Sequence, residues 1–324
     1  MARTSRYAPD RGLTVRMTVT MFLLGLVFVA FVALIIGIMT AANASGAAIV
    51  LVALIFGGGT AIASLFFSDK IALAAAGAVE VTPQQAPELH GIVDRLCALA
   101  DMDKPRVAIA PTQMPNAFAT GRNSKNSVLC VTEGLLSPRL DLQKEELEGI
   151  LAHELSHVAH KDVQVMTVAS LLAIVAALLV RFAFYSELFG GGRRGNDQNS
   201  FPIILVIMAV SAVVYAISFL LIRLLSRYRE LAADRSGALL TGQPSKLASA
   251  LQKVSLGMNR IPTQDLRTAE PLNAFYFAPA MKLSGGGGPN LSVLFSTHPS
   301  LEKRIEQLEK IQRQLGQVTP GTPR

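Results

Sequence analysis

Long uncharged apolar stretches alternate with mixed polar segments along the chain. Four stretches contain no Asp, Glu, Lys or Arg: Met17 to Ala42, Gly46 to Phe67, Val163 to Val180 and Phe201 to Ile222. About 18 or more such residues suffice to cross a bilayer as a helix. We therefore expect four transmembrane helices, arranged as two hairpins. The third stretch is only just long enough and contains Gln164, so a buried core helix is its alternative.

Basic residues beside these stretches predict the orientation in the membrane. Four arginines lie at or before the start of the first stretch, whereas the loop around Asn43 carries no charge. Because Lys and Arg favour the cytoplasmic side, we expect the N-terminus to be cytoplasmic. The loop between the third and fourth stretches carries Arg181, Arg193 and Arg194 and runs against this bias. The N-terminus lacks a small-residue cleavage site after a short apolar core, so the first stretch is expected to be a span rather than a removed signal peptide.

The segment between the second and third stretches has the pattern of a mixed α/β fold. Apolar residues repeat with helical spacing from Ala86 to Ala100, and "RVAIA", "NAFAT" and "SVLCVT" have the pattern of short strands. Asp141 is a candidate cap for a helix through "QKEELEGILAHELSHVAHKD". After the fourth stretch we expect further helices, the last of them opened by Pro299.

The stretch "HELSH" on this expected helix has the spacing of a metal site. Residues four apart on a helix lie on one face, so His153 and His157 can offer imidazole nitrogens to one ion. Glu154 projects beside them, where a carboxylate can take a proton from a water activated by zinc. A helix with two surface histidines at a membrane edge is the alternative interpretation.

A catalytic zinc site needs a third protein ligand and an open position. The segment "SRYRELAAD" offers Glu230 and Asp234, four residues apart and therefore on one helix face. Spacing alone permits either carboxylate. If the third and fourth stretches both cross the membrane, the chain returns to the same side and brings this segment to the height of His157. Without "HELSH", an ordinary charged helix at the membrane surface would be the preferred interpretation.

Composition limits the other classes of function. Apolar residues make up 51% of the 324 residues, and the formal net charge of +7 is mostly explained by arginines beside the apolar stretches. We see no basic patch with interleaved aromatic residues, so no nucleic-acid partner is expected. Cys97 and Cys130 form neither a disulfide framework nor a Cys-x-x-Cys metal site.

The motifs "LAHELSHV", "YRELAADRSGA", "PNAFATGR" and "FSTHPSLEKRIEQL", together with the paired apolar stretches, resemble the HtpX family of membrane-bound zinc metalloproteases. The resemblance covers nearly the whole chain. It implies one catalytic Zn²⁺ held by His153, His157 and Glu230, with Glu154 as the general base. It also implies that Asp234 orients a ligand histidine and that His298 stabilises the oxyanion of the tetrahedral intermediate.

The motif "NAFAT" has two interpretations, a core strand and a substrate-binding edge strand, and we favour the second. The residues Asn116, Ala117, Phe118 and Ala119 alternate small and large side chains, as in an ordinary core strand. Beside a zinc helix, the same residues could form an edge strand that binds an extended substrate through backbone hydrogen bonds.

The expected fold is mainly α with a small β-sheet, an α+β zincin-like protease domain with four transmembrane helices. We expect the following order of segments: a basic tail at 1–16, a transmembrane hairpin at 17–67, the first part of the protease domain at 68–162, a second hairpin at 163–225 with its loop at 186–200, the second part of the protease domain at 226–315 and a disordered tail at 316–324.

The expected function is that of a zinc-dependent endopeptidase of the cell membrane, facing the cytoplasm. The family resemblance implies misfolded or damaged membrane proteins as substrates, with the lipid bilayer as a further partner, and leaves the oligomeric state unknown. A non-catalytic zinc-containing membrane scaffold or chaperone is the alternative. The carboxylate of Glu154 argues against it, because a structural zinc site has no use for a base.

Overall fold

The computed structural model describes residues 11–41, 47–123, 125–190, 200–259 and 298–317. The chain divides into two compact units. One contains Phe66–Val163 and Ser226–Arg324 together with Met1–Thr14, and we call it the mixed unit. The other contains Val15–Leu65 and Gln164–Leu225, and we call it the helical unit.

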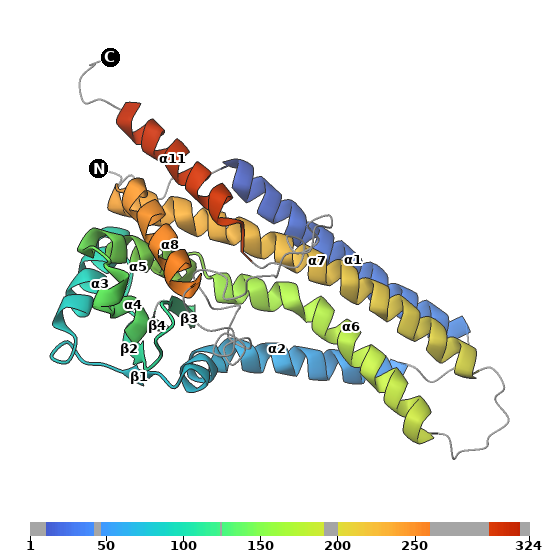
Figure 1. Ribbon diagram of the computed structural model, residues 1–324. Coiled ribbons are helices and arrows are strands. Elements are labelled where there is room, and N and C mark those ends of the chain that lie inside the picture. Colours follow the sequence, from blue (N-terminus) through green and yellow to red (C-terminus); the bar gives the residue numbers. More distant parts are fainter. Residues whose placement is uncertain (1–10, 42–46, 124, 191–199, 260–297, 318–324) are drawn as a thin grey trace. The chain divides into compact units, whose positions relative to one another are not determined.

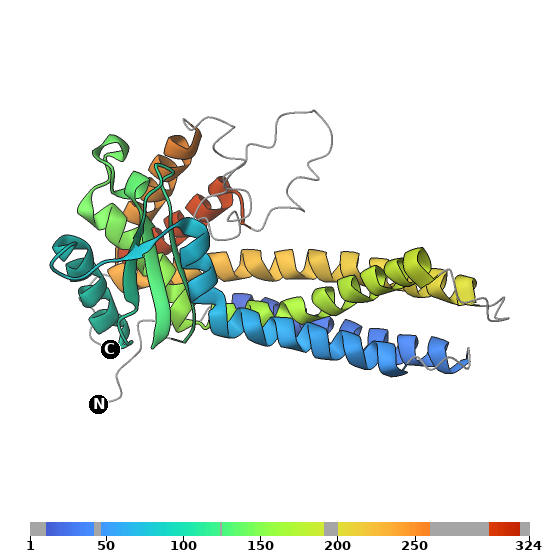
Figure 2. The ribbon, with the colours of Figure 1, turned by 90° about the horizontal axis from the view of Figure 1, so that it is seen from below.

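Four helices contribute to the helical unit: α1 (Arg11–Ala41), α2 (Ala47–Ala76), α6 (Asp162–Gly190) and α7 (Ser200–Thr241). Helices α1, α6 and α7 run alongside one another in the helical unit (Figures 1 and 2). They share one apolar core, which includes Phe31, Val175 and Leu225. Other large apolar side chains of these helices are exposed, among them Phe22 at 69% and Val213 at 59%. Exposed apolar faces of this kind are typical of helices that contact lipid.

The prediction of four transmembrane helices is wrong for the described part of the chain. Two helical stretches there are long and apolar enough to cross a membrane, Arg11–Gly37 and Leu205–Thr241. A third qualifies only if α5 (Lys144–Ala159) and the start of α6 count as one bent span. The side chains of α6 are described only as far as Leu178, so the predicted third span, Val163–Val180, is not covered in full. Much of the predicted second span, Gly46–Phe67, lies outside the residues whose side chains are described.

The mixed unit is built around a four-stranded sheet with the order β1-β2-β4-β3. Strands β2 and β4 are parallel, and the two outer strands are antiparallel to their neighbours. The strands are β1 (Val79–Glu80), β2 (Arg106–Ala110), β3 (Ala117–Asn123) and β4 (Asn126–Thr132). The remaining elements are α3 (Pro87–Ala100), α4 (Glu133–Leu136), the 3-10 helix η1 (Pro138–Leu140), α5, α8 (Pro244–Asn259), α11 (Leu301–Gln317) and the last part of α7. The protein is thus mostly helical, with a small mixed sheet.

Alternation along β4 builds a core on each face of the sheet, since successive side chains point to opposite faces. Leu129 and Val131 join the large core formed with α3, α5, α8 and α11. Val128 and Cys130 point to the other face, where Ala72 near the end of α2 covers them. Both faces are therefore buried, and helix α5 is packed inside the mixed unit (Figure 1).

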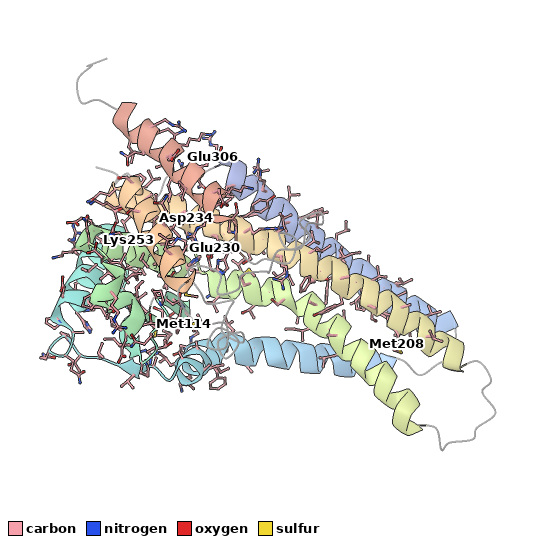
Figure 3. The ribbon with its side chains drawn as sticks, viewed as in Figure 1. Met114, Met208, Glu230, Asp234, Lys253 and Glu306 are labelled. Carbon is pink, nitrogen blue, oxygen red and sulfur yellow. The ribbon has the colours of Figure 1, made fainter. Side chains whose placement is uncertain are left out.

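The start of α5 differs from the sequence-based expectation. Asp141 does not cap α5; it ends η1 in the left-handed conformation, with φ of 50°. The cap is Gln143, which forms a capping box with Glu146. The buried carboxylate of Glu146 accepts hydrogen bonds from the Gln143 backbone N–H at 2.7 Å, the Ser249 hydroxyl at 2.6 Å and the Lys253 ammonium at 2.8 Å (Lys253 is labelled in Figure 3). This carboxylate joins the first turn of α5 to α8.

We expect Glu146→Gln to lower the free energy of unfolding by about 1.5–3 kcal/mol, the range for hydrogen bonds to a charged group. Burial opposes ionisation, but the bonds from Lys253, Ser249 and Gln143 hold the pKa of Glu146 below its ordinary value of 4.5. A lowered pKa in the folded state stabilises the fold above the unfolded value, and this stabilisation is lost as the pH falls through the folded value. Denaturant unfolding in detergent should therefore show a deficit at neutral pH that shrinks well below pH 4.5.

The exposed neighbour Glu145 supplies the control for this measurement, since Glu145→Gln removes a charge from the same helical turn without a buried partner. A deficit for Glu146→Gln that is independent of pH would contradict the ionic explanation.

Candidate metal site and its supporting charges

Helix α5 presents two imidazoles to one point. His153 and His157 lie one helical turn apart, and their Nε2 atoms are 3.2 Å from each other. The two rings are nearly perpendicular, at 86°. His153 is fully buried and His157 is partly buried. Both Nε2 atoms can therefore direct a lone pair at the same ion.

Glu230 of α7 completes the group. One carboxylate oxygen lies 3.4 Å from Nε2 of His157, and the other lies 3.8 Å from Nε2 of His153. Ligand atoms of all three residues lie within 4.8 Å of one another. Zinc bonds of 2.0–2.1 Å in a tetrahedral arrangement separate neighbouring ligand atoms by roughly 3.3 Å. The three side chains therefore fit a zinc-sized ion with only small adjustments.

A glycine brings α7 close enough for Glu230 to reach α5. A Cβ atom added to Gly237 would lie 2.8 Å from the backbone nitrogen of His153 and 3.1 Å from its Cα. These distances are shorter than ordinary contacts with a Cβ atom, so a side chain at this position would push the two helices apart. The absence of a side chain at Gly237 thus positions Glu230 two turns away on the same helix.

Each ligand histidine contacts an aspartate through its other nitrogen. Nδ1 of His153 lies 2.9 Å from the Asp234 carboxylate, and Nδ1 of His157 lies 2.7 Å from the Asp162 carboxylate. An aspartate at Nδ1 favours the tautomer that carries its proton there, and this leaves Nε2 available to a metal. Figure 3 labels Glu230 and Asp234, which lie four residues apart on α7.

Buried arginines hold both aspartates. Arg304 of α11 donates two hydrogen bonds to Asp234, at 2.8 and 2.7 Å, and its third nitrogen lies 3.8 Å from Glu230. Arg229 of α7 forms an ion pair with Asp162. The two guanidinium groups face four carboxylates in this cluster, which leaves a formal charge of two minus; the carboxylates are those of Glu154, Asp162, Glu230 and Asp234. One divalent cation would neutralise the cluster.

Glu154 lies beside the ligands and next to the sheet. It is 4% exposed, and its carboxylate accepts a hydrogen bond from the backbone N–H of Ala119 at 3.2 Å. Burial, reinforced by the negative charge of Glu230, raises the pKa of Glu154 to about 8. A carboxyl group with a pKa in this range can both accept and release a proton at physiological pH. A bound cation would lower this pKa through its own charge.

Protonation of the ligand histidines responds to the same surroundings. Burial lowers the pKa of His153 to about 4, so this imidazole is neutral and able to bind a metal. Burial also opposes charge on His157, but the carboxylates of Glu230 and Glu154 outweigh it and raise its pKa. A proton therefore competes with a metal ion for the imidazole of His157.

The segment "NAFAT" forms the edge of the sheet nearest α5. Ala117, Phe118 and Ala119 belong to β3, which follows β4 at the end of the strand order, and Asn116 directly precedes it. The N–H of Ala119 points to Glu154 of α5. Asn116 and Thr132 exchange backbone and hydroxyl hydrogen bonds that fix the entry into this strand.

His298 also lies in the cluster. It is buried, and its Nδ1 is 2.9 Å from Oε2 of Glu230. The chain segment before α11 thus contributes a third imidazole that contacts Glu230, which Arg304 also approaches.

Comparisons with known proteins identify the family to which this site belongs. Residues 83–312 match the family described as Peptidase family M48. A protein named Protease HtpX homolog 1 from Streptomyces coelicolor is 58% identical over 98% of this chain and 99% of its own length. Protease HtpX homologs from Moorella thermoacetica and Pyrococcus furiosus are 48% and 42% identical, over 94% and 78% of this chain and 96% and 83% of their own lengths.

The chain belongs to the HtpX family of M48 metalloproteases. Family M48 proteases depend on a metal, and the group formed by His153, His157 and Glu230 is able to bind one. The apolar helices of the helical unit and the HtpX relatives together make this chain a membrane metalloprotease.

The structure places the candidate site residues together and adds three charged residues that the sequence analysis did not name. The structure brings Glu154, Glu230, Asp234 and His298 together around the histidines of α5, as expected. The three missed residues are Asp162, Arg229 and Arg304. Arg304 had a signal in the sequence: it lies four residues before the buried Leu308 on α11, on the apolar face. Asp162 and Arg229 had none, because charged residues beside an apolar stretch are ordinary in membrane proteins.

We expect Glu230 and Asp234 to differ in their effect on metal content. Glu230→Ala should lose most of the bound metal, since it removes one of the three candidate ligands. Asp234→Asn should retain zinc with roughly 10- to 100-fold weaker affinity, the usual loss when a residue that orients a ligand histidine is changed. Zinc content and chelator competition on purified protein measure both effects.

Asparagine is preferred to alanine at position 234 because it still fills the space beside buried Arg304. Stoichiometric zinc in Glu230→Ala combined with no zinc in Asp234→Asn would reverse the two roles.

Proposed function

We propose that this HtpX-family protease is an integral-membrane zinc endopeptidase that cleaves misfolded or damaged membrane proteins on the cytoplasmic side. The observation that carries the proposal is the convergence of His153, His157 and Glu230 on one point, with the carboxylate of Glu154 beside it. Two imidazoles and one glutamate are an established ligand set for catalytic zinc, which keeps a position open for water or substrate.

The nature of the ligands favours zinc over other common metals. Calcium and magnesium prefer sites made of oxygen ligands, whereas imidazole nitrogen suits zinc. Ligand atoms separated by 3.2–3.8 Å also match tetrahedral zinc. A zinc ion held there would supply Lewis acidity, which polarises the scissile carbonyl and lowers the pKa of the attacking water.

Glu154 is proposed as the general base. Its carboxylate accepts the proton of the attacking water and then donates it to the nitrogen of the leaving amine. The contact with Ala119 orients this carboxylate, since the N–H of a strand is a fixed donor. A scaffold that held zinc only for structure would have no use for a carboxylate in this position.

We propose that β3 aligns the substrate. An extended peptide could join the outer edge of β3 through backbone hydrogen bonds. It would then lie beside Glu154, since Ala119 of this edge strand donates a hydrogen bond to the Glu154 carboxylate. Asn116, Ala117, Phe118 and Ala119 are the residues assigned to this role. Recognition through the backbone suits unfolded substrates, because it demands little of the side chains.

His298 is proposed to donate an N–H to the oxyanion of the tetrahedral intermediate. Its burial beside Glu230 supports this role, since a donor held in a site shielded from water is worth more than one in solution.

The proposed orientation in the cell membrane rests on charge. The arginines at Arg3, Arg6, Arg11 and Arg16 favour a cytoplasmic N-terminus. We assign the protease domain to residues 68–162 and 226–315 and place it in the cytoplasm. Cys97 and Cys130 are both free and buried, which is compatible with a reducing compartment.

The proposal predicts that Glu154→Gln keeps zinc and loses peptide cleavage. The amide cannot accept the proton of the attacking water, so the rate on an unfolded substrate such as casein should fall by at least about 100-fold. Zinc analysis and cleavage assays should be run on the same purified samples.

The matched control is Glu145→Gln, an identical change at an exposed position of the same helix, which should cleave at the unaltered rate. Cleavage by Glu154→Gln at the rate of this control would remove Glu154 from the mechanism.

A further inference from the structure

The turn after α5 places the carboxylate of Asp162 against His157, near the end of that helix. Helix α5 ends at Ala159, and Lys161 then adopts the left-handed conformation with φ of 57°. Asp162 follows as the first residue of α6 and is 7% exposed. Its Oδ2 atom lies 2.7 Å from Nδ1 of His157, five residues earlier.

Arg229 joins this turn to α7. The side chain is 5% exposed, and one of its terminal nitrogens contacts Oδ1 of Asp162 and donates to the backbone carbonyl of His160 at 3.2 Å. A guanidinium is buried at a large cost in solvation unless charged and polar partners compensate. Asp162 is therefore held between a ligand histidine on one oxygen and a buried arginine on the other.

The same order of groups occurs at the other ligand histidine. Nδ1 of His153 lies against Asp234, and Asp234 receives two hydrogen bonds from buried Arg304. The two arginines come from different elements, since Arg304 belongs to α11 and Arg229 belongs to α7. An arginine, an aspartate and a histidine thus occur in this order at each imidazole.

We propose that Asp162 and Arg229 are positioning residues for His157. Asp162 accepts the Nδ1–H of His157 and turns its Nε2 toward Glu230 and His153, while Arg229 fixes Asp162 in place and acts only through it. The inference rests on the proposed zinc site. It extends that site to the turn between α5 and α6, where neither residue touches the ion or the substrate.

Purified full-length protein in detergent allows a test that does not depend on activity. The variants are Asp162→Asn, Arg229→Met, Arg229→Lys and the double variant Asp162→Asn/Arg229→Met. The control is Glu148→Gln, which alters another buried carboxylate of α5. The partner of Glu148 is Arg95, which contacts none of the candidate ligands in the described part of the chain. Zinc affinity is measured by chelator competition, ligand geometry by the visible absorption of the Co²⁺-substituted protein, and stability by unfolding of the metal-free protein.

Asp162→Asn should bind zinc roughly 10- to 100-fold more weakly than the unaltered protein and change the Co²⁺ spectrum. Arg229→Met should show a similar loss, and Arg229→Lys should recover part of it. Because Arg229 acts through Asp162, the double variant should bind no more weakly than Asp162→Asn alone. The double variant also removes both buried charges together, so it remains informative if Arg229→Met alone does not fold.

Three results would overturn the inference. Zinc affinity of Asp162→Asn equal to that of Glu148→Gln would do so, even with a lower stability, since that outcome assigns Asp162 a purely structural role. Losses that multiply in the double variant would show that Arg229 acts independently of Asp162. Failure of the unaltered protein to bind zinc would overturn the proposed function and the inference with it. This failure is distinguishable from the other two, because it appears in the unaltered protein before any variant is measured.

Discussion

The close approach of α7 to α5 is the constraint on which the metal site depends. Two of the three candidate ligands lie on α5, and their spacing is fixed by the helix itself. The third, Glu230, lies on another helix and reaches them only because Gly237 lets the two backbones meet beside His153. The remaining features follow from this contact. Asp234 falls between Gly237 and Glu230 on α7 and therefore also faces His153.

Bringing these ligands together gathers carboxylates in a buried cluster, and the structure compensates for this charge in two ways. Arg229 and Arg304 are buried against the aspartates that hold the histidines. The excess negative charge that remains matches a divalent cation. Burial raises the pKa of Glu154, and the negative charge of Glu230 raises the pKa of both Glu154 and His157. Metal binding and proton release are therefore expected to be coupled in this protein.

Local patterns predicted the fold and site well wherever one element determines the outcome. The strands, α3 and the pairing of His153 with His157 all follow from spacing within a single segment. The burial of Arg229 could not be predicted, since an arginine at the end of an apolar stretch is ordinarily solvated, whereas here it contacts Asp162 and the carbonyl of His160 in the turn after α5. Asp141 does not cap α5, because it ends the preceding 3-10 helix η1 instead. Length and apolar composition predicted four spans, whereas two helical stretches of the described residues, Arg11–Gly37 and Leu205–Thr241, are long and apolar enough to cross a membrane.

The most direct test of the account is zinc K-edge X-ray absorption on the purified, unaltered protein. We predict a first coordination sphere of nitrogen and oxygen at about 2.0–2.1 Å, with the outer scattering of two imidazoles. That result would place His153 and His157 on one ion together with a carboxylate. Sulfur ligands at about 2.3 Å, or a first sphere with fewer than two imidazoles, would contradict the central claim that α5 and α7 together form a two-histidine, one-glutamate zinc site.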